Sequence, residues 1–370
     1  MSVVYKKLED VCEILDSRRV PITAKDRKAG TYPYYGANGL QDYVADYIFD
    51  DELVLLAEDG GNFGSKERPI AYRVSGKCWV NNHAHVLKAK SNMHVDYLCY
   101  ALMFYDTEGL VNGATRQKLT QAALRQMVIP YRDMTEQLQI IKKISQIVRS
   151  IEKRKEELQL LDQLVKSRFI ELFGDPKQNP KGYPVKEFDE ISVLITDGEH
   201  ATPRRTDKGI YLLSARNILN HALQLDDVDY IDEEEYTRIA RRVVPQAGDV
   251  LISCSGSIGR CCVVPEELRF QMVRSAALIR FDDTIKPVFA EWLITSDELQ
   301  RQISMSATQS SQANLFQGKI RKLRGYVPPM ELQNQFAAFV EQTDKSKLAV
   351  QKGLQELEIL KKSLMQQYFG

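Results

Sequence analysis

Apolar residues recur every seven positions in two stretches of the chain, and a proline precedes each stretch. The first repeat consists of Ile144, Ile151, Leu158, Val165 and Leu172. The second consists of Phe336, Val350, Leu357 and Leu364, with Thr343 interrupting its spacing. Such a repeat places apolar side chains along one stripe of an α-helix, as in a coiled coil. We therefore predict two long helices that pair through these side chains, each a rod of roughly 55–60 Å.

A single helix of this kind cannot bury its apolar stripe alone. The economical solution is that the two helices pack on each other. The alternative is that each helix folds back on the domain that precedes it. Polar residues such as Lys155 and Asp162 interrupt a second apolar line on the first helix. Interruptions of this kind lower the stability of a coiled coil but fix its register.

The two helical stretches are copies of each other. Residues 158–174 are compared here with residues 354–370, which lie 196 positions later. Eight residues of the first stretch are identical to their counterparts in the second: Leu158, Gln159, Leu161, Leu164, Lys166, Ser167, Phe173 and Gly174. Upstream, Gln137 faces Gln333, and Pro130 corresponds to Pro328. A repeat of this length indicates that the whole architecture is duplicated.

The stretches before the helices are then expected to be related domains. Glu52–Leu55 resembles Asp249–Ile252, and Asn82–Lys88 aligns with Arg274–Arg280. The apolar runs are short and bounded by turn-forming residues, as strands are, and Val95–Tyr105 and Val288–Ser304 read as short helices. We predict an α+β fold whose two domains each have a curved, largely antiparallel sheet. The predicted segments are a first domain at 1–133, a long helix at 134–174, a second domain at 175–329 and a long helix at 330–370.

Composition narrows the function without naming it. The chain has 50 basic and 50 acidic residues and a formal net charge of zero, which counts against a protein that binds only by nonspecific attraction to phosphate. Six cysteines are scattered without CxxC spacing, which favours buried, reduced thiols. The N-terminus has no apolar segment of signal-peptide length, and no apolar stretch approaches a membrane span. We expect a cytoplasmic protein without a membrane partner.

Motifs for catalysis are weak. Gly60–Lys66 lacks the spacing of a phosphate-binding loop, and Ser253–Gly259 lacks that of a nucleophile elbow; both are expected to be hairpin turns. His83 and His85 could supply two metal ligands, but a third with suitable spacing is missing and the second domain has Ser275 and Ala277 there. We expect no catalysis and no metal, with a metal-dependent hydrolase using His83 and His85 as the alternative.

Two related domains linked by long helices suit a ligand that presents two sites at a fixed separation, and duplex DNA is such a ligand. The chain resembles the specificity subunits of type I restriction–modification systems. Four motifs carry the resemblance: the helix start at Ile129–Ile141 and its echo at Val327–Gln333, the helix ends Phe173-Gly174 and Phe369-Gly370, Trp79–Leu87, and Gly248–Ile252 with Ser255–Gly259.

The resemblance implies two target recognition domains, each reading one half of a split site in double-stranded DNA, and two antiparallel helices that set the unread gap. It implies two modification (methyltransferase) subunits that bind S-adenosylmethionine, and restriction (motor-nuclease) subunits; no cofactor is expected on this chain. The helices should also dock the modification subunits, so Lys155, Asp162 and Lys347 are expected to face a partner or solvent. A specificity partner in another type of restriction–modification system and a coiled-coil scaffold for protein ligands are the remaining alternatives.

Individual base contacts do not follow from the resemblance, so candidate DNA-binding residues are chosen by residue type and position in turns. In the first domain they are Arg18, Arg19, Tyr35, Asn38, Asn62, Lys66, Asn82, His83, Arg116 and Lys118. In the second domain they are His200, Thr202, Arg204, Arg205, Arg216, Ser255, Ser257, Arg260, Arg274, Gln309 and Gln312. Arginine, asparagine, glutamine, lysine and serine are side chains that read base edges.

Overall fold

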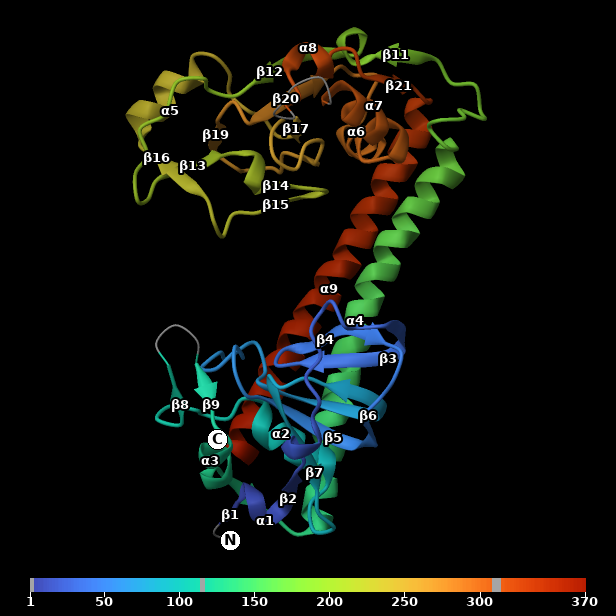
Figure 1. Ribbon diagram of the computed structural model, residues 1–370. Coiled ribbons are helices and arrows are strands. Elements are labelled where there is room, and N and C mark those ends of the chain that lie inside the picture. Colours follow the sequence, from blue (N-terminus) through green and yellow to red (C-terminus); the bar gives the residue numbers. More distant parts are fainter. Residues whose placement is uncertain (1–2, 114–116, 308–313) are drawn as a thin grey trace. The chain divides into compact units, whose positions relative to one another are not determined.

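A computed structural model describes residues 3–113, 117–307 and 314–370 (Figure 1). The chain divides into two compact units: unit 1 comprises residues 1–156 and 351–370, and unit 2 comprises residues 157–350. Each unit holds one sheet-containing domain and parts of both long helices. The boundaries between the two units fall in the middle of both long helices. This division therefore differs from the four predicted segments, and the boundaries of those segments stay a prediction.

The domain of unit 1 is built on a six-stranded sheet in the order β2-β7-β5-β6-β3-β4. The strands are β2 (Cys12–Ile14), β3 (Ala29–Gly36), β4 (Gly39–Val44), β5 (Phe49–Ala57), β6 (Ala71–Val80) and β7 (Ala84–Ala89). All neighbours are antiparallel except β3 and β6. Small pairs join β1 (Val4–Lys7) to β10 (Val128–Tyr131) and β8 (Val111–Asn112) to β9 (Lys118–Leu119), and short helices lie at η1 (Asp16–Arg18), α1 (Leu8–Val11), α2 (Val95–Met103) and α3 (Gln121–Gln126).

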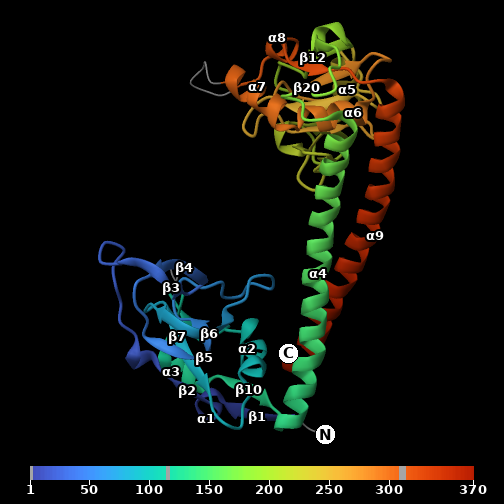
Figure 2. The same ribbon diagram turned by 90° about the vertical axis from the view of Figure 1, so that its right-hand side faces the viewer.

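The second half of the central strand β5, residues 53–57, is buried on both faces, because its side chains alternate between two cores. Leu53 and Leu55 join one apolar cluster, while Val54 and Leu56 join the other. Helix α2 belongs to the second cluster and lies between the sheet and the long helix α4 (Figure 2). This explains why β5 reads as a nearly continuous apolar run rather than as an alternating one.

The domain of unit 2 contains a four-stranded sheet, β12-β20-β17-β18, and a three-stranded sheet, β16-β13-β19. The strands of the two sheets are β12 (Ser192–Asp197), β13 (Ile210–Leu213), β16 (Asp229–Ile231), β17 (Val250–Ser253), β18 (Cys261–Val263), β19 (Phe270–Met272) and β20 (Ala276–Phe281). The remaining elements are β11 (Val185–Glu187) paired with β21 (Arg324–Tyr326), β14 (Ile218–Leu219) paired with β15 (Ala222–Leu223), η2 (Phe188–Glu190), η3 (Ala215–Asn217), α5 (Glu233–Ala240), α6 (Pro287–Ile294), α7 (Asp297–Ala307) and α8 (Gln317–Ile320).

The two domains share strand order and register, as the predicted repeat requires. The order β2-β7-β5-β6 in unit 1 corresponds to β12-β20-β17-β18 in unit 2. Ala57 pairs with Ala84 in unit 1, and their counterparts Ser253 and Ala276 pair in unit 2. The predicted α+β class is confirmed. The predicted helix Val288–Ser304 is interrupted, because α6 ends at Ile294 and α7 begins at Asp297.

One long strand of unit 1 is divided in unit 2. Strand β6 pairs with β5 along most of its length and then, at Trp79 and Val80, runs parallel to β3. In unit 2 the first role falls to β18 and the second to β19, which runs parallel to β13. Pro265 lies between β18 and β19 and cannot donate a ladder hydrogen bond. Glu267 has a φ of 64°, which an extended strand cannot contain.

The long helices are α4 (Met134–Phe173) and α9 (Met330–Phe369), and each has 40 residues. They run side by side and antiparallel within each unit (Figures 1 and 2). In unit 1 an ion pair joins Lys155 to Glu358 at 3.6 Å. In unit 2 another joins Lys347 to Asp162 at 2.7 Å. Lys155 and Asp162 are exposed to solvent, as expected, with 57% and 61% of their side chains accessible, and each also pairs with the opposite helix. Lys347 departs from the expectation, because only 18% of its side chain is exposed and its ammonium binds Asp162 across the helix pair.

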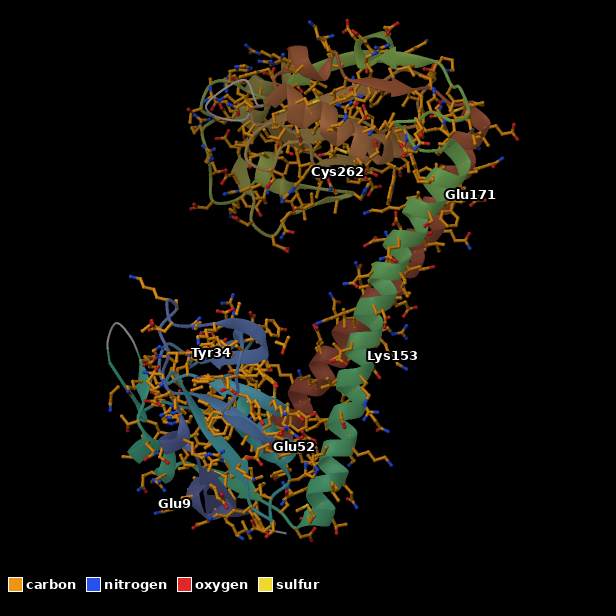
Figure 3. All side chains as sticks on the ribbon, turned by 45° about the vertical axis from the view of Figure 1, so that its right-hand side comes forward. Glu9, Tyr34, Glu52, Lys153, Glu171 and Cys262 are labelled. Atoms are coloured by element: carbon orange, nitrogen blue, oxygen red, sulfur yellow. The ribbon has the colours of Figure 1, made fainter. Side chains whose placement is uncertain are left out.

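Most residues of the predicted apolar stripes are buried. The buried members are Ile144, Ile151, Val165, Leu172, Phe336 and Val350, and the half-buried members are Leu158, Leu357 and Leu364. Thr343, which interrupts the second repeat, is also buried, and its hydroxyl donates to the Phe339 carbonyl at 2.9 Å. On their outer faces the helices present charged side chains to solvent, such as Lys153 near the middle of α4 and Glu171 in its last turn (Figure 3).

Each long helix is fixed to its domain by a buried glutamine near the helix start. The Gln137 side chain is fully buried; it accepts from His94 N at 2.8 Å and donates to the carbonyls of Asn92 and Arg132. The counterpart Gln333 is equally buried. It accepts from Lys286 N at 2.8 Å and donates to the carbonyls of Thr284 and Pro328. The same three bonds are thus made twice, and each glutamine ties a long helix to the start of α2 or α6.

The helix ends carry aromatic residues into the domain cores. At the end of α4, Phe173 is fully buried and its ring centroid lies 4.8 Å from that of Phe289 on α6. At the end of α9, Phe369 is half-buried and lies 5.0 Å from Tyr97 on α2. The identical Phe-Gly endings therefore dock in equivalent ways. Within the described residues no helix is both long and apolar enough to cross a membrane.

All six cysteines are free and buried, as predicted. Burial raises the pKa of the Cys12, Cys99 and Cys254 thiols to about 12. A thiol with so high a pKa stays protonated at neutral pH and is a poor nucleophile or metal ligand. These cysteines serve as small apolar core residues.

Candidate nucleic-acid interface

Four loops converge at one edge of the sheet in unit 1, and we call residues 36–39, 58–60, 81–83 and 117–119 the loop edge of unit 1. The backbone of Glu58 is central to it: Glu58 N donates to His83 O at 2.8 Å, and Leu119 N donates to Glu58 O at 2.7 Å. The Asn38 amide donates to Gly60 O at 3.0 Å. Chain segments far apart in sequence are thus held side by side.

The same edge is built in unit 2 from residues 214–217, 254–257, 273–275 and 314–315, which we call the loop edge of unit 2. Cys254 occupies the position of Glu58: its N donates to Ser275 O at 2.8 Å, and Leu315 N donates to its carbonyl at 2.9 Å. Ala215 N donates to the Ser275 hydroxyl at 3.1 Å. The backbone connections correspond pair by pair, although the side chains differ.

The structure brings part of the candidate set onto these loop edges. The candidates on or directly beside the loop edge of unit 1 are Tyr35, Asn38, Asn62, Asn82, His83 and Lys118. Those on or directly beside the loop edge of unit 2 are Arg216, Ser255, Ser257, Arg260 and Arg274. Both Asn82 and its counterpart Arg274 are exposed, so equivalent positions offer an amide in one unit and a guanidinium in the other.

Other candidates lie elsewhere or serve the fold. Arg18 stacks on Phe49, with its guanidinium carbon 4.9 Å from the ring centroid, and Arg19 is partly buried and binds Glu58. Lys66 and Thr202 are exposed in loops. Candidates Arg116, Gln309 and Gln312 lie outside the described residues.

Several candidate arginines of unit 2 are held by acidic side chains. Arg205 and Arg216 both bind Asp229, at 2.9 and 3.0 Å. Arg204 binds Asp232 and Glu234, and the hydrogen bond to Glu234 raises the pKa of the Arg204 guanidinium. Exposed ion pairs of this kind contribute only about 0–1 kcal/mol. A DNA phosphate could therefore replace the carboxylate partner of such an arginine at a small cost in free energy. In this way a protein without net positive charge could still bind phosphate.

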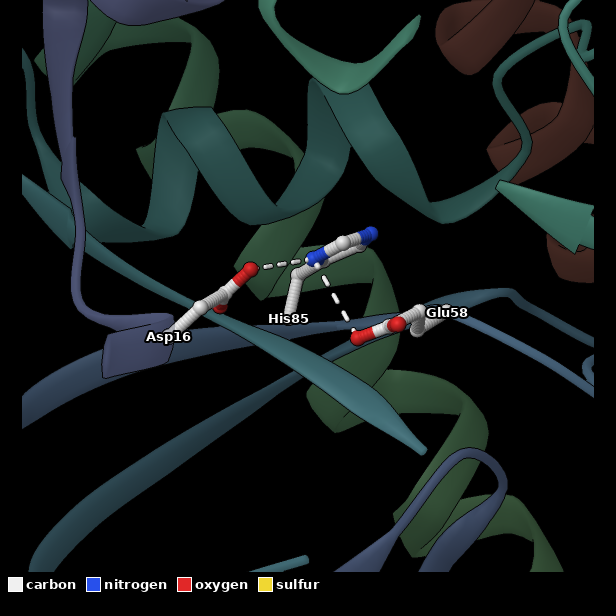
Figure 4. Close-up of side chains that lie close together, drawn as sticks. All are labelled: Asp16, Glu58 and His85. Atoms are coloured by element: carbon white, nitrogen blue, oxygen red, sulfur yellow. Dashed lines mark hydrogen bonds and ion pairs between the residues drawn. The ribbon is translucent and has the colours of Figure 1, made fainter. Parts of the chain in front are cut away.

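A buried charged network lies beneath the loop edge of unit 1 (Figure 4). His85, on β7, has its Nδ1 2.6 Å from Asp16 Oδ2 and 3.7 Å from Glu58 Oε2. Its Nε2 lies 2.9 Å from Leu119 O. Arg19 donates to Glu58 at 2.7 Å and Lys118 binds the other Glu58 oxygen at 3.0 Å. Two carboxylates are thus matched by surrounding cations and donors.

The charges of this network are mutually stabilised. Burial raises the pKa of the Asp16 carboxyl, but the hydrogen bond and charge of His85 and the bond from Val86 N outweigh it, and the pKa is lowered. Burial likewise raises the pKa of Glu58, and the hydrogen bonds from Arg19 and Lys118 outweigh it, so that this pKa is lowered too. Both carboxyls are held as carboxylates.

The arrangement bears on the metal-dependent hydrolase alternative. Asp16, Glu58 and His85 offer ligand atoms within 4.8 Å of one another. However, both nitrogens of His85 face acceptors, so neither has a lone pair directed at an ion. His83 is not part of this group: its Nδ1 binds Asp59 at 2.6 Å. In unit 2 the equivalent positions hold Asp197, Cys254 and Ala277, so the domains do not share this set of side chains.

Sequence reasoning missed Asp16 and Glu58, because neither stands in a motif and each meets His85 only through strand pairing. It also did not assign a role to Gln137 and Gln333, although their correspondence was visible in the repeat. The repeat itself was the signal that could have revealed this role. A glutamine that recurs at the same position near the start of both long helices would be unusual if it only faced solvent.

Comparisons with known proteins agree with this architecture. Residues 2–161 match the family model of the type I restriction modification DNA specificity domain. The chain is 26% identical over 370 residues to a putative type I restriction enzyme specificity subunit of Haemophilus influenzae, covering 95% of this chain and 90% of the relative. The resemblance predicted from the sequence is confirmed.

Solved structures share the fold. The S subunit of a type I restriction–modification system from M. genitalium superposes with a TM-score of 0.62 at 14% identity, over 100% of this chain and 96% of the other. A chain from a study of complex assembly and conformational transition of the type I R-M system gives a TM-score of 0.59 at 15% identity, over 100% and 99%. At this level of identity the likeness concerns the fold.

Proposed function

We propose that this chain, which resembles type I restriction–modification specificity subunits over its length and matches their DNA specificity domain at residues 2–161, recognises a bipartite sequence in double-stranded DNA. The loop edge of each unit reads one half of the sequence. The observation that carries the proposal is the construction of the same loop edge twice, on the same strand order and register, with different exposed side chains. A shared scaffold with different polar groups suits two different half-sites.

Side chains at matched positions of the two loop edges have the chemistry that base reading needs. Asn82 and Lys118 in unit 1 correspond to Arg274 and Asn314 in unit 2; the first three are exposed and Asn314 is half-buried. An asparagine can bond N6 and N7 of adenine and an arginine O6 and N7 of guanine, each pair worth about 1–3 kcal/mol of discrimination. The proposal assigns these positions, rather than the ion-paired Arg204, the leading role in reading.

The long helices serve two purposes in this proposal. A 40-residue helix is roughly 60 Å long, which is the length scale of a gap between half-sites.

Leu164 and Leu360 occupy equivalent positions on α4 and α9 and are about half exposed, at 49% and 47%. We assign them to docking of two modification subunits, because a repeated exposed leucine suits two copies of one partner. Those subunits supply S-adenosylmethionine and the methyl transfer, restriction subunits supply cleavage, and this chain supplies neither.

The experiment is binding of the chain, assembled with its modification subunits, to duplexes carrying the split sequence found by mapping methylated adenines in host DNA. Inserting or deleting one base pair in the gap should abolish tight binding, whereas changing the identity of gap bases should not. Indifference to gap length would overturn the proposal. The chain alone should neither methylate nor cleave the same duplex.

A further inference from the structure

We propose that His85 is a positioning residue for recognition of the half-site read by unit 1. Its imidazole fixes the backbone at Leu119 and thereby sets where the 117–119 loop presents Lys118. This inference deepens the proposed function and rests on it. The network of His85 has no counterpart in unit 2, so the inference concerns one half-site only.

The contacts of His85 join segments that are distant in sequence. The ring is almost completely buried, with 1% of the side chain exposed. On one side Nδ1 binds Asp16, which also accepts from Val86 N at 2.9 Å. On the other side Nε2 lies 2.9 Å from Leu119 O. Because a carbonyl oxygen can only accept, the bond to Leu119 requires a hydrogen on Nε2 of the ring.

Leu119 is consequently held on both sides of its backbone. Its N–H donates to Glu58 O at 2.7 Å, and its carbonyl accepts from His85. Its side chain is fully buried. The neighbouring Lys118 is exposed and binds Glu58 Oε1 at 3.0 Å, so the anchored backbone limits the positions that the Lys118 ammonium can reach.

Unit 2 keeps the backbone connections of unit 1, where Leu119 N donates to Glu58 O and a bridge joins Asp59 to Lys118, but it lacks the side-chain anchor. Ala277 stands where His85 stands, and a methyl group cannot donate a hydrogen bond. The corresponding segment is connected by Leu315 N to Cys254 O at 2.9 Å and by a bridge between Ser255 and Asn314. The side-chain anchor is therefore a property of unit 1 and not of the shared scaffold.

The test compares two conservative variants of His85, each of which keeps one of the two hydrogen bonds of the imidazole ring and loses the other. An asparagine at 85 can place its amide nitrogen near Nδ1 and keep the bond to Asp16, whereas the longer glutamine can reach the Nε2 position and keep the bond to Leu119 O. Val86→Ala is the matched control: Val86 is fully buried in the same strand but packs in the opposite apolar cluster. It weakens unit 1 without removing either bond.

Each variant is assembled with modification subunits, and binding is measured against duplexes with single base changes in each half-site. His85→Asn should reduce discrimination in one half-site by roughly tenfold, the scale of one lost base contact, and leave the other unchanged. His85→Gln and Val86→Ala should discriminate like the wild type. Hydrogen exchange should show the Leu119 amide opening faster in His85→Asn than in His85→Gln.

The inference is overturned if both His85 variants discriminate alike, if both half-sites relax together, or if Val86→Ala relaxes recognition as much as His85→Asn. Equal exchange at Leu119 in the two His85 variants would overturn it without reference to DNA. A wild-type assembly that binds no split sequence would instead refute the proposed function, and the exchange measurement would still judge the anchor.

Discussion

The helix junctions of the two units and their loop edges have diverged to different degrees. At the junctions, Gln137 and Gln333 make the same three hydrogen bonds to equivalent backbone groups. At the loop edges only the backbone bonds correspond, and the buried network around His85 exists in unit 1 alone. The difference indicates that the scaffold constrains how a domain is attached to a helix, while the side chains on and beneath the loop edge are free to specialise.

The largest effect is expected from truncating the aromatic residue at a helix end. Phe173→Ala should destabilise unit 2 by about 3–5 kcal/mol, because a fully buried ring in contact with Phe289 and Phe336 leaves a cavity. Phe369→Ala should destabilise unit 1 by less, since Phe369 is only half-buried. Chemical denaturation followed by hydrogen exchange in each unit measures both. Equal losses of unfolding free energy in the two variants would mean that Phe173 and Phe369 are packed more similarly than their burial indicates.

The junction glutamines should give the next largest effect, and a symmetric one. Gln137→Leu keeps most of the volume but leaves His94 N and two carbonyls without their partner, at a cost of about 1–3 kcal/mol for each buried group left unpaired. Gln333→Leu should cost unit 2 a similar amount. The exposed Gln139 provides the control, because Gln139→Leu should change the free energy of unfolding by less than about 0.5 kcal/mol. A large difference between the two junction variants would contradict the equivalence of the junctions.

Acid should sharpen the contrast beneath the loop edges. The pKa values of Asp16 and Glu58 are lowered in the folded state, from ordinary values of 3.8 and 4.5, because His85, Arg19 and Lys118 outweigh burial. A carboxyl with a lowered pKa stabilises the fold above its ordinary pKa, and this contribution is lost as the pH falls through the folded-state value. Below about pH 4 the loop edge of unit 1 should therefore open before that of unit 2, where Cys254 and Ala277 replace two of these groups.

Hydrogen exchange of Leu119 and Leu315 between pH 6 and pH 3 measures this contrast, and Asp16→Asn supplies its control. The variant removes one titrating carboxyl, so its exchange at Leu119 should depend less on pH than that of the wild type. Parallel acid dependence at Leu119 and Leu315 would show that the network contributes nothing specific to unit 1.

The long helices and the duplication could be predicted from the sequence because both depend on spacing alone. The seven-residue repeat and the matched endings at Phe173 and Phe369 placed two helices that pair with each other. The match between the two strands was also predicted, but one residue out of register. The sequence alignment set Asp249–Ile252 against Glu52–Leu55, whereas the strand pairings set them against Leu53–Leu56. Pro265, which separates β18 from β19, was not used, and so the division of the β6 counterpart was not predicted.

The loop edges could be predicted only in part. Turn composition selected Asn38, Asn82 and Lys118 as DNA-binding candidates, which stays a prediction, and the structure places all three on one loop edge. The same reasoning chose Arg19, whose side chain is only 12% exposed and binds Glu58. Whether an arginine in a turn reaches solvent or an internal carboxylate depends on strand pairing between residues that are distant in sequence. The same reason hid Asp16 and Glu58. Lys347 was misassigned, because its ammonium crosses the helix pair to Asp162 and only 18% of its side chain stays exposed.

The smallest effect on stability is expected from substitutions at Leu164 and Leu360. These substitutions distinguish a defect in assembly with the modification subunits from a defect in folding. Both leucines are about half exposed, so Leu164→Asp and Leu360→Asp should each change the free energy of unfolding by less than about 0.5 kcal/mol. Each should nevertheless weaken binding of one modification subunit, because a charge would be buried in an apolar contact. Mass measurement of the assembled complex should show one bound modification subunit for either single variant and none for the double variant. The control uses Lys166 and its counterpart Lys362, which are both exposed. Lys166→Asp and Lys362→Asp test whether any new acidic residue on this surface also causes the loss of a modification subunit. Retention of two subunits in the leucine double variant would place docking elsewhere on the chain.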